Sequence, residues 1–126
     1  MIDIEQQLAY WRSSADEDFA VGRDLITTGR VRHGLFFIHL ALEKLLKAHV
    51  CKGTRNLAPR IHNLVRLVEA AQLNPNKEDL NALAEMNAFN IEGRYPSSLG
   101  PPPTAEEAGV YLEQADRVFK WLKNLL

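Results

Sequence analysis

The stretch from Val31 to Cys51 places the strongest constraint on what this chain can fold into. In an α-helix each residue turns the chain by about 100°, and on that wheel the apolar side chains of this stretch spread over roughly half of the circumference. They include Leu35, Phe36, Ile38, Leu42, Leu45, Leu46 and Val50. A helix at the surface of a domain has a narrower apolar stripe. The pattern therefore predicts that residues 31–51 form the central helix of a helical domain, ending at Lys52-Gly53.

Further segments have the periodicity of amphipathic helices and are expected to surround this central one. They cover residues 3–28, 60–73, 77–91 and 104–126. Gly29 suits a left-handed stop after the first of them, and Pro59 suits the first turn of the helix that follows it. Thr104 with Glu107 three residues later is a capping-box pattern. Because four of the six prolines fall within 96–103, that connection is expected to be extended.

Length and composition limit the chain to a single compact unit. Its 126 residues are 46% hydrophobic and 25% charged, which is typical of a globular protein. A chain of this size buries enough surface for one core but not for two domains. The sequence has neither an internal repeat nor the alternating pattern of a strand. We therefore expect one all-α domain over residues 1–126, an up-and-down bundle of four to five helices.

The formal net charge of −1 hides a strong asymmetry along the chain. Residues 1–22 hold five acids and one base, and residues 67–126 hold nine acids and five bases, so that each segment carries −4. Residues 23–66 hold nine bases, two acids and all four histidines, which gives +7. A basic segment of this kind points to an anionic partner, provided that the fold gathers the bases on one face.

The sequence also indicates where the protein functions. The N-terminal residues lack the basic start and apolar run of a secretory signal, and no apolar stretch approaches the length of a membrane span. The single cysteine, Cys51, excludes a disulfide framework and fits a reducing compartment. A soluble, cytoplasmic protein with no membrane association is therefore expected.

Two polar residues stand within the apolar arc of the central helix. His39 and Glu43 are four residues apart, which stacks them on one face. An ionised carboxylate among apolar side chains needs a cationic or hydrogen-bonding partner. Lys47, four residues further on, or an arginine from another helix would neutralise Glu43 inside the bundle. The alternative is that Glu43 lines a polar cleft beside the helix.

Several motifs, in order along the chain, resemble those of the HEPN domain family. The run HLALEKLLKAHV (39–50) resembles the family's second-helix signature, with Glu43, Lys44 and Lys47 matching it. PRIHNL (59–64) resembles a Thr-His-Asp-Leu element, in which His62 and Leu64 match while Ile61 and Asn63 replace the expected residues. Arg94-Tyr95-Pro96 matches the Arg-Tyr-Pro element after the fourth helix. Looser first-helix positions also fit the family pattern, namely Trp11, Ala15, Asp18 and Ala20.

The resemblance implies a small helical bundle that is usually homodimeric. Such proteins are often encoded beside a minimal nucleotidyltransferase, in modules of the toxin–antitoxin kind, and the family name reflects a proposed nucleotide-binding role. Members of other branches are metal-independent ribonucleases that carry an Arg followed, after four to six residues, by a His near the C-terminal helices. Here no histidine follows His62, which counts against cleavage.

These considerations select a candidate site for a nucleotide or another anion. Arg94 offers donors that match phosphate, and Tyr95, which Pro96 biases toward an extended conformation, offers a face for stacking a base. His62 would hydrogen-bond a phosphate near the start of a helix. The full set of predicted binding residues is Arg94, Tyr95, Glu43, Lys47, Lys44, His62 and His39, with no catalytic residue, metal or cofactor assigned.

Three functions remain open from the sequence. The leading hypothesis is a non-catalytic HEPN protein that dimerises and binds a nucleotide or a nucleotidyltransferase partner. The second is a ribonuclease toxin in which His39 or His62 is the acid/base and Arg94 stabilises phosphate charge. The third is a module for protein interaction alone, whose apolar helix faces form a dimer or dock the nucleotidyltransferase.

Overall fold

The protein is an all-α bundle, as the periodicity predicts. The structure, a computed structural model, describes residues 2–91 and 95–126. Over these residues it has five α-helices, two short 3-10 turns and no strand. The helices are α1 (Ile4–Thr27), α2 (Val31–Thr54), α3 (Leu64–Ala70), α4 (Lys77–Met86) and α5 (Ala105–Asn124), and the 3-10 turns span Asn87–Phe89 and Pro96–Ser98. None of the described helices is long and apolar enough to cross a membrane.

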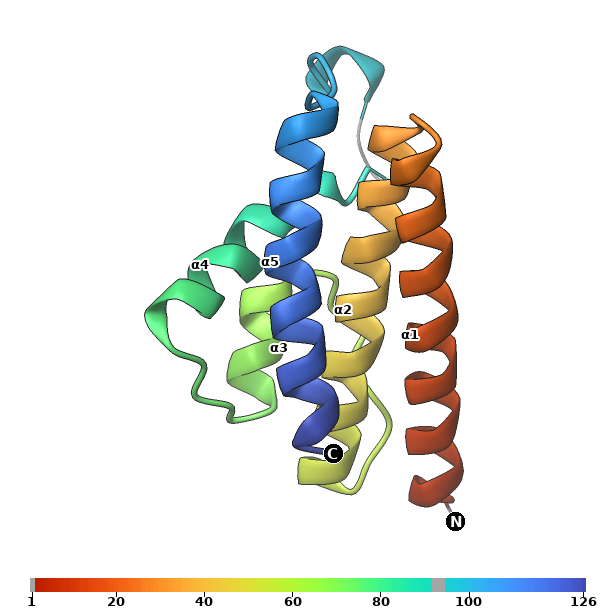
Figure 1. Cartoon of the computed structure of the whole chain (residues 1–126). Coiled ribbons are helices and arrows are strands. Elements are labelled where there is room, and N and C mark those ends of the chain that lie inside the picture. Colours follow the sequence, from red (N-terminus) through yellow and green to blue (C-terminus); the bar gives the residue numbers. More distant parts are fainter. Residues whose placement is uncertain (1, 92–94) are drawn as a thin grey trace.

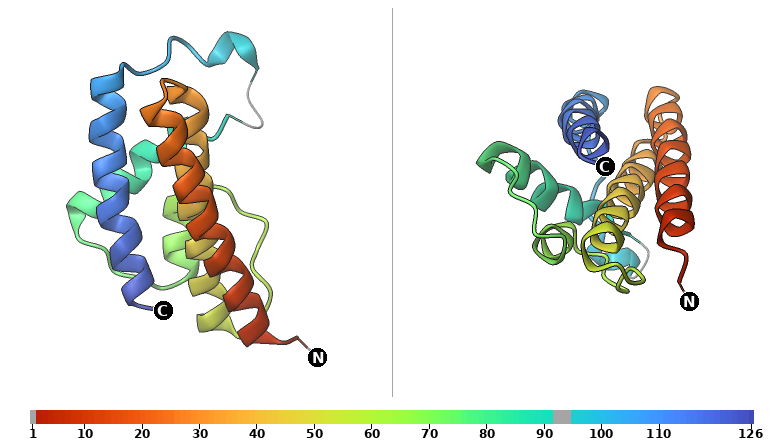
Figure 2. Two further views of the ribbon diagram at one scale, coloured as in Figure 1. Left: turned by 45° about the vertical axis from the view of Figure 1, so that its right-hand side comes forward. Right: turned by 90° about the horizontal axis from the view of Figure 1, so that it is seen from below.

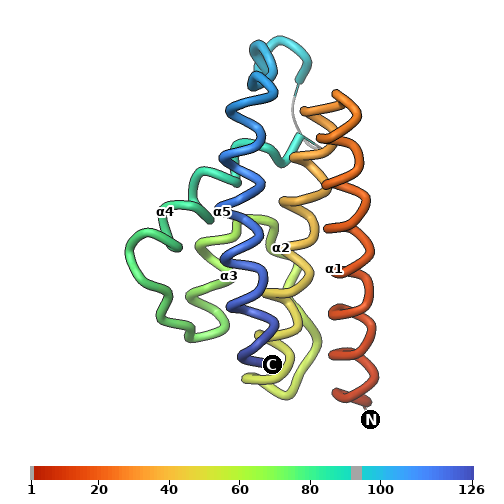
Figure 3. Tube along the Cα trace, viewed as in Figure 1, coloured from red at the N-terminus to blue at the C-terminus, as the bar shows by residue number. Residues whose placement is uncertain are grey.

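The helix α2 is the centre of the bundle. Fourteen of its 24 residues are buried, against five of 24 in α1. The long helices α1, α2 and α5 run side by side, while the shorter α3 and α4 pack on the side away from α1 (Figure 1, Figure 2). The tube in Figure 3 shows α3 and α4 joined as a hairpin at the edge of the bundle. Apolar side chains from all five helices form one buried cluster around α2, which confirms its predicted central position.

The ends of three helices differ from the sequence prediction. Helix α2 does not end at Lys52-Gly53 but continues to Thr54, where Arg55 takes a left-handed conformation (φ 56°) and its N–H bonds to the carbonyl of Cys51. Helix α3 begins at Leu64, not at residue 60, because the side chain of Asn63 caps it by accepting from the N–H of Arg66 at 3.2 Å. Helix α4 ends at Met86, before the 3-10 turn.

Other boundaries agree with the sequence. Gly29 follows α1 with φ 90°, and Arg30 N bonds to the carbonyl of Leu25, as in a left-handed helix stop. Thr104 and Glu107 form both hydrogen bonds of a capping box at the start of α5. The proline-rich connection is mainly non-helical as expected, apart from its single 3-10 turn at Pro96–Ser98.

Two glycines allow α1 and α2 to approach closely. A Cβ added to Gly34 would lie 2.8 Å from the carbonyl oxygen of Gly22, and one added to Gly22 would lie 2.9 Å from the carbonyl oxygen of Gly34. Both contacts are too short for a real Cβ, and the atom met is backbone in each case. The two glycines therefore determine how closely α1 and α2 approach each other.

Candidate functional site

The carboxylate of Glu43 is the centre of a buried polar cluster on α2. Its side chain is 6% exposed, and Lys47, one turn later on the same helix, donates to Oε2 at 3.0 Å. The Nδ1 atom of His62 lies 3.1 Å from Oε2 and 3.2 Å from Oε1. Of the two alternatives that the sequence leaves open, the structure has the first: Glu43 is neutralised inside the bundle, by Lys47 at i+4 and by His62 rather than by an arginine. We call His39, Glu43, Lys47 and His62 the Glu43 cluster.

His62 reaches the cluster from the segment that connects α2 to α3, rather than from the start of α3 as expected. Asn63 begins that helix, so His62 stands one residue before the cap, and its side chain is 59% exposed. A carboxylate only accepts hydrogen bonds, so Nδ1 carries the hydrogen and donates it as a hydrogen bond to the Glu43 oxygens. The other ring nitrogen, Nε2, makes no hydrogen bond to the described residues and is left for solvent or a ligand.

His39 lies beside Glu43 but does not bond to it. Its Nδ1 atom is 4.0 Å from Oε1 of Glu43, and the side chain is only 1% exposed. Neither ring nitrogen has a hydrogen-bond partner within the part of the chain that the structure describes. Burial lowers the pKa of His39 and outweighs the attraction of the Glu43 carboxylate, which acts in the opposite direction. His39 is therefore a neutral imidazole at pH 7.

Helix α1 closes the cluster on the side of Lys47. The ammonium nitrogen of Lys47 lies 5.6 Å from the centre of the Trp11 ring, within the range of a cation–π contact. Lys47 is only 7% exposed, so its charge is balanced by the carboxylate and the indole rather than by water. This commits Lys47 to the protein interior and leaves it unavailable as a direct anion ligand.

Lys44 and Tyr95 are not part of this cluster. Lys44 faces α1, where its ammonium nitrogen is 2.7 Å from Asp18 Oδ2 and 2.7 Å from Ser14 Oγ. Tyr95 is 78% exposed and extended (φ −75°, ψ 146°), as Pro96 predicts. Arg94 lies outside the residues that the structure describes. The structure thus brings together four of the seven predicted residues and separates Lys44 from them.

Burial also shifts the pKa values of two other side chains of the interior, Cys51 and His49. Burial raises the pKa of the Cys51 thiol, which keeps it protonated and unsuited to nucleophilic attack. His49 is buried with Nε2 2.8 Å from the carbonyl oxygen of Leu122, and burial lowers its pKa. Among the described residues, no group of three or more His, Cys, Asp or Glu is arranged to hold a metal ion.

A cavity that the sequence does not predict lies at the N-terminal end of α2. It has a volume of about 670 Å³, and its lining includes Arg32, His33 and Phe37 from α2 together with Pro102 and Pro103. The basic segment and the prolines were both evident in the sequence. No pattern in the sequence places the two together, because about 70 residues separate them along the chain.

Comparison with known proteins identifies the family. The profile of the HEPN domain matches residues 8–125, nearly the whole chain. The chain belongs to the HEPN family. This confirms the family that the motifs of the sequence resemble. In this HEPN chain, the second-helix signature supplies Glu43 and Lys47 of the cluster, and the element around residue 62 supplies the histidine that contacts the carboxylate.

Two solved structures share the HEPN fold. An archaeal HEPN homologue, ST0689, aligns with a TM-score of 0.71 at 18% identity, covering 99% of this chain and 98% of its own. The TT1696 protein of Thermus thermophilus aligns with a TM-score of 0.77 at 19% identity, covering 95% of this chain and 98% of its own. At these identities the likeness concerns the fold alone. A search of curated proteins gave no match.

Proposed function

We propose that this HEPN protein is a non-catalytic binding protein that dimerises and binds a nucleotide, or a nucleotide-bearing partner such as a minimal nucleotidyltransferase. The observation that carries the proposal is the internal pairing of Glu43. Lys47 and His62 already bind its carboxylate, so the negative charge of Glu43 does not neutralise the exposed cations of residues 23–66. Arg60 and Arg66, on either side of His62 in the sequence, are exposed and form no ion pair with the described residues.

Such a surface suits phosphate. Guanidinium groups donate hydrogen bonds in a geometry that matches phosphate oxygens, and the outward nitrogen of His62 adds a further polar contact. Arg94 and Tyr95 complete the predicted site from the loop before α5. The internal cancellation of the buried charges also supports binding rather than catalysis, since Lys47 is held in place and His39 is sealed from solvent.

Calorimetric titration of the protein with ATP, GTP and a short RNA tests the nucleotide claim. We expect saturable binding of at least one of them, with an affinity that falls as salt is raised because the contacts are electrostatic. Lys120→Ala, which removes a 70% exposed lysine of α5, is the matched control and should bind as the wild type does. Absence of heat with all three ligands would rule out the nucleotide claim.

The partner claims need separate measurements. Light scattering after size exclusion should give the mass of a dimer, and a nucleotidyltransferase encoded next to this chain should copurify with it. An Arg94→Ala variant that assembles differently but binds nucleotide unchanged would favour a module for protein interaction alone. A monomer that ignores the nucleotidyltransferase contradicts both parts of the claim.

The pair of His62 and Glu43 favours a second candidate, a metal-independent ribonuclease. A buried carboxylate that accepts from one imidazole nitrogen orients the ring and leaves the other nitrogen to exchange a proton with a substrate. Arg94 would stabilise the phosphate charge, and a dimer partner would supply the second acid/base group. Cleavage therefore requires His62 and Arg94 together.

Incubation of the pure protein with tRNA and mRNA separates the two candidates. Cleavage that disappears in His62→Ala and in Arg94→Ala, but persists in Lys120→Ala, would favour the ribonuclease. Intact RNA at protein concentrations that saturate nucleotide binding would exclude it and leave the binding function standing.

A further inference from the structure

The cavity at the junction of α1 and α2 has the size of a small-molecule site. Its volume of about 670 Å³ lies within the range of roughly 300–1,000 Å³ that is usual for ligand pockets. The first turn of α2 forms one wall, and the segment leading into α5 forms another. Figure 2 shows this segment passing over the end of the bundle where α1 turns into α2. The cavity therefore lies between two segments that are far apart in the sequence.

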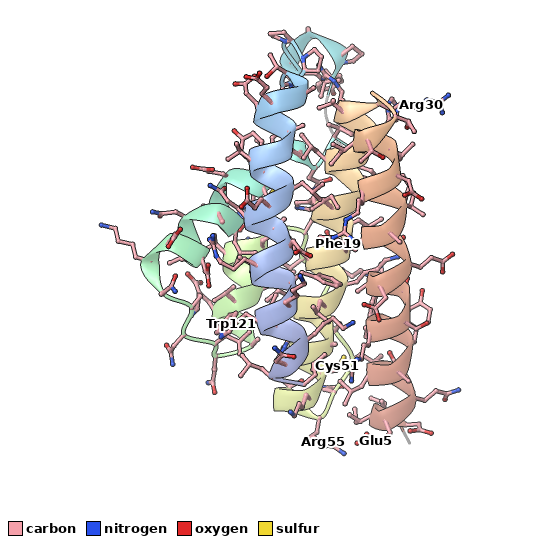
Figure 4. The ribbon with its side chains drawn as sticks, viewed as in Figure 1. Glu5, Phe19, Arg30, Cys51, Arg55 and Trp121 are labelled. Atoms are coloured by element: carbon pink, nitrogen blue, oxygen red, sulfur yellow. The ribbon has the colours of Figure 1, made fainter. Side chains whose placement is uncertain are left out.

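Its lining combines apolar walls with cations. Val31, Phe37, Pro102 and Pro103 provide apolar and aromatic surface, and Arg32 and His33 provide the polar groups. No carboxylate of the described residues lines it. Arg30 also borders the cavity, but its side chain extends into solvent in Figure 4 and is not counted as a ligand. An apolar body with an anionic group is the ligand chemistry that this lining fits.

A hydrogen bond holds the cavity in shape. The guanidinium of Arg32 donates to the carbonyl oxygen of Gly100, two residues before Pro102. This bond ties the proline segment to the first turn of α2, so that both walls are in place before a ligand arrives. A preformed site loses less conformational entropy on binding than one that must first be assembled.

The backbone of α2 adds to the positive character of this end. Arg30, the residue that precedes the helix, makes no side-chain capping bond, and the N-terminal end of a 24-residue helix carries partial positive charge. By contrast, a second cavity of about 440 Å³, at the other end of α2, includes Glu5, whose carboxylate lies 3.7 Å from Arg55. Arg12 and Lys52 also line this second cavity, but no aromatic side chain of the described residues does, so it offers no face on which a base could stack.

We propose that the cavity at the α1–α2 junction is the main binding site for the nucleotide, ahead of the exposed surface around Arg60, His62 and Arg66. The base lies against Phe37 and the two prolines, and the phosphates lie at Arg32, His33 and the first turn of α2. This inference rests on the proposed nucleotide-binding function and gives that function a seat other than the Glu43 cluster, which borders none of the cavities described above. Aromatic stacking accepts any base, so the site favours nucleotides as a class.

Four variants titrated with ATP test this placement. Phe37→Leu removes the stacking face but keeps apolar bulk, and His33→Gln removes an exposed imidazole without risk to the fold. Each should weaken ATP binding roughly tenfold, as expected for the loss of a base–aromatic stack or of a hydrogen bond to a phosphate. Lys120→Ala, on α5, should bind ATP as the wild type does. His62→Gln, which removes the exposed imidazole of the Glu43 cluster, should lose less affinity than either cavity variant.

A second measurement needs no variant. In amide NMR spectra of the wild-type protein, ATP should shift the signals of Val31, Arg32 and His33, and circular dichroism should show that Phe37→Leu keeps its helix content. Unchanged affinity in both Phe37→Leu and His33→Gln would overturn the placement while leaving nucleotide binding intact. Loss of affinity in His62→Gln alone would also overturn it and move the nucleotide to the Glu43 cluster. Absence of binding to the wild type is the distinct result that removes the proposed function itself.

Discussion

Glu43 and Lys47 form an ion pair that is almost completely withdrawn from water. Their side chains are 6% and 9% exposed, and the two groups lie 3.0 Å apart. The attraction within such a pair is largely cancelled by the cost of removing both charges from water. Removing only one of the two partners is a different matter, because the other charge then stays buried without compensation. Replacing Glu43 or Lys47 alone should therefore destabilise the protein more than replacing both residues together.

We expect Glu43→Gln to lower the free energy of unfolding by about 3 kcal/mol, because it leaves the buried ammonium of Lys47 without a counter-charge. Urea titration at pH 7 measures the change. The double variant Glu43→Leu/Lys47→Met replaces both charges by apolar groups and should recover at least half of the loss. A double variant that is less stable than Glu43→Gln would show instead that the ion pair contributes net stability.

His39 makes the stability of the fold sensitive to acid. Its folded-state pKa lies below the ordinary value of 6.5 because of burial, so the unfolded chain binds its proton at a higher pH than the folded one. Stability is then fully present above pH 6.5 and declines as the pH falls below it. His49, whose pKa burial also lowers, contributes in the same direction. We expect His39→Leu to lose less stability than the wild type between about pH 7.5 and pH 5.5.

Urea titrations at these two pH values provide the measurement, and His33→Ala, at an exposed position, is the matched control. At the higher pH the His39→Leu variant should be at least as stable as the wild type, since neither ring nitrogen has a hydrogen bond to lose among the described residues. An equal acid response in His39→Leu and wild type would assign the sensitivity to other groups.

At the scale of elements, the sequence predicts which helices form more reliably than where they end. Apolar periodicity extends over many residues, whereas an end depends on one or two local bonds. Residues 60–63 have no helical conformation although Ile61 continues the apolar pattern, because the side chain of Asn63 takes the N–H of Arg66 and starts the helix there. Its amide oxygen also accepts from the side chain of Asn87, a contact that no local pattern reveals.

The approach of α1 to α2 depends on Gly34. An added methyl group would lie 2.8 Å from the carbonyl oxygen of Gly22, so the helices must move apart or shift. We expect Gly34→Ala to lower the free energy of unfolding by about 2 kcal/mol, as overpacking of a helix contact does. Thermal and urea unfolding check this value.

Gly53→Ala is the control within the same helix. Nothing lies within 4 Å of a Cβ at Gly53, and alanine is the better helix former by up to about 1 kcal/mol. We therefore expect it to raise stability slightly. If both substitutions have the same sign, the close approach does not control the α1–α2 contact.

At the scale of the whole molecule, the fold uses part of the charge asymmetry internally. Lys44 of the basic segment pairs with Asp18 of the acidic first helix at 2.7 Å, and Arg23 pairs with Asp116 of α5 at 3.1 Å. The sequence could predict the burial of Glu43 from the helical wheel. It could not predict which bases remain for a ligand, since that depends on which helices become neighbours. The cavity at the α1–α2 junction was missed for the same reason.

The stability contributed by the exposed ion pairs between helices should depend on salt more strongly than that of the partly buried pair of Lys44 with Asp18. Lys123 pairs with Asp16 at 2.8 Å across α5 and α1, and this pair and the pair of Arg23 with Asp116 have side chains between 27% and 50% exposed. Exposed pairs contribute roughly 0.2–1 kcal/mol each and are screened by salt. We expect Asp16→Asn/Asp116→Asn to lose about 1 kcal/mol in low salt and less than half of that in about 1 M NaCl.

Asp18→Asn provides the contrast, because Asp18 and Lys44 are only 13% and 19% exposed. Partly buried charges are screened much less, so this variant should lose nearly the same stability in low salt as in high salt. Urea titrations at both salt concentrations supply the values for the two variants. Equal screening of the two variants would mean that solvent reaches the α1–α2 pair as freely as the α1–α5 pairs. In that case the bases of residues 23–66 would all be solvated charges, and any of them could pair with an anion from solution.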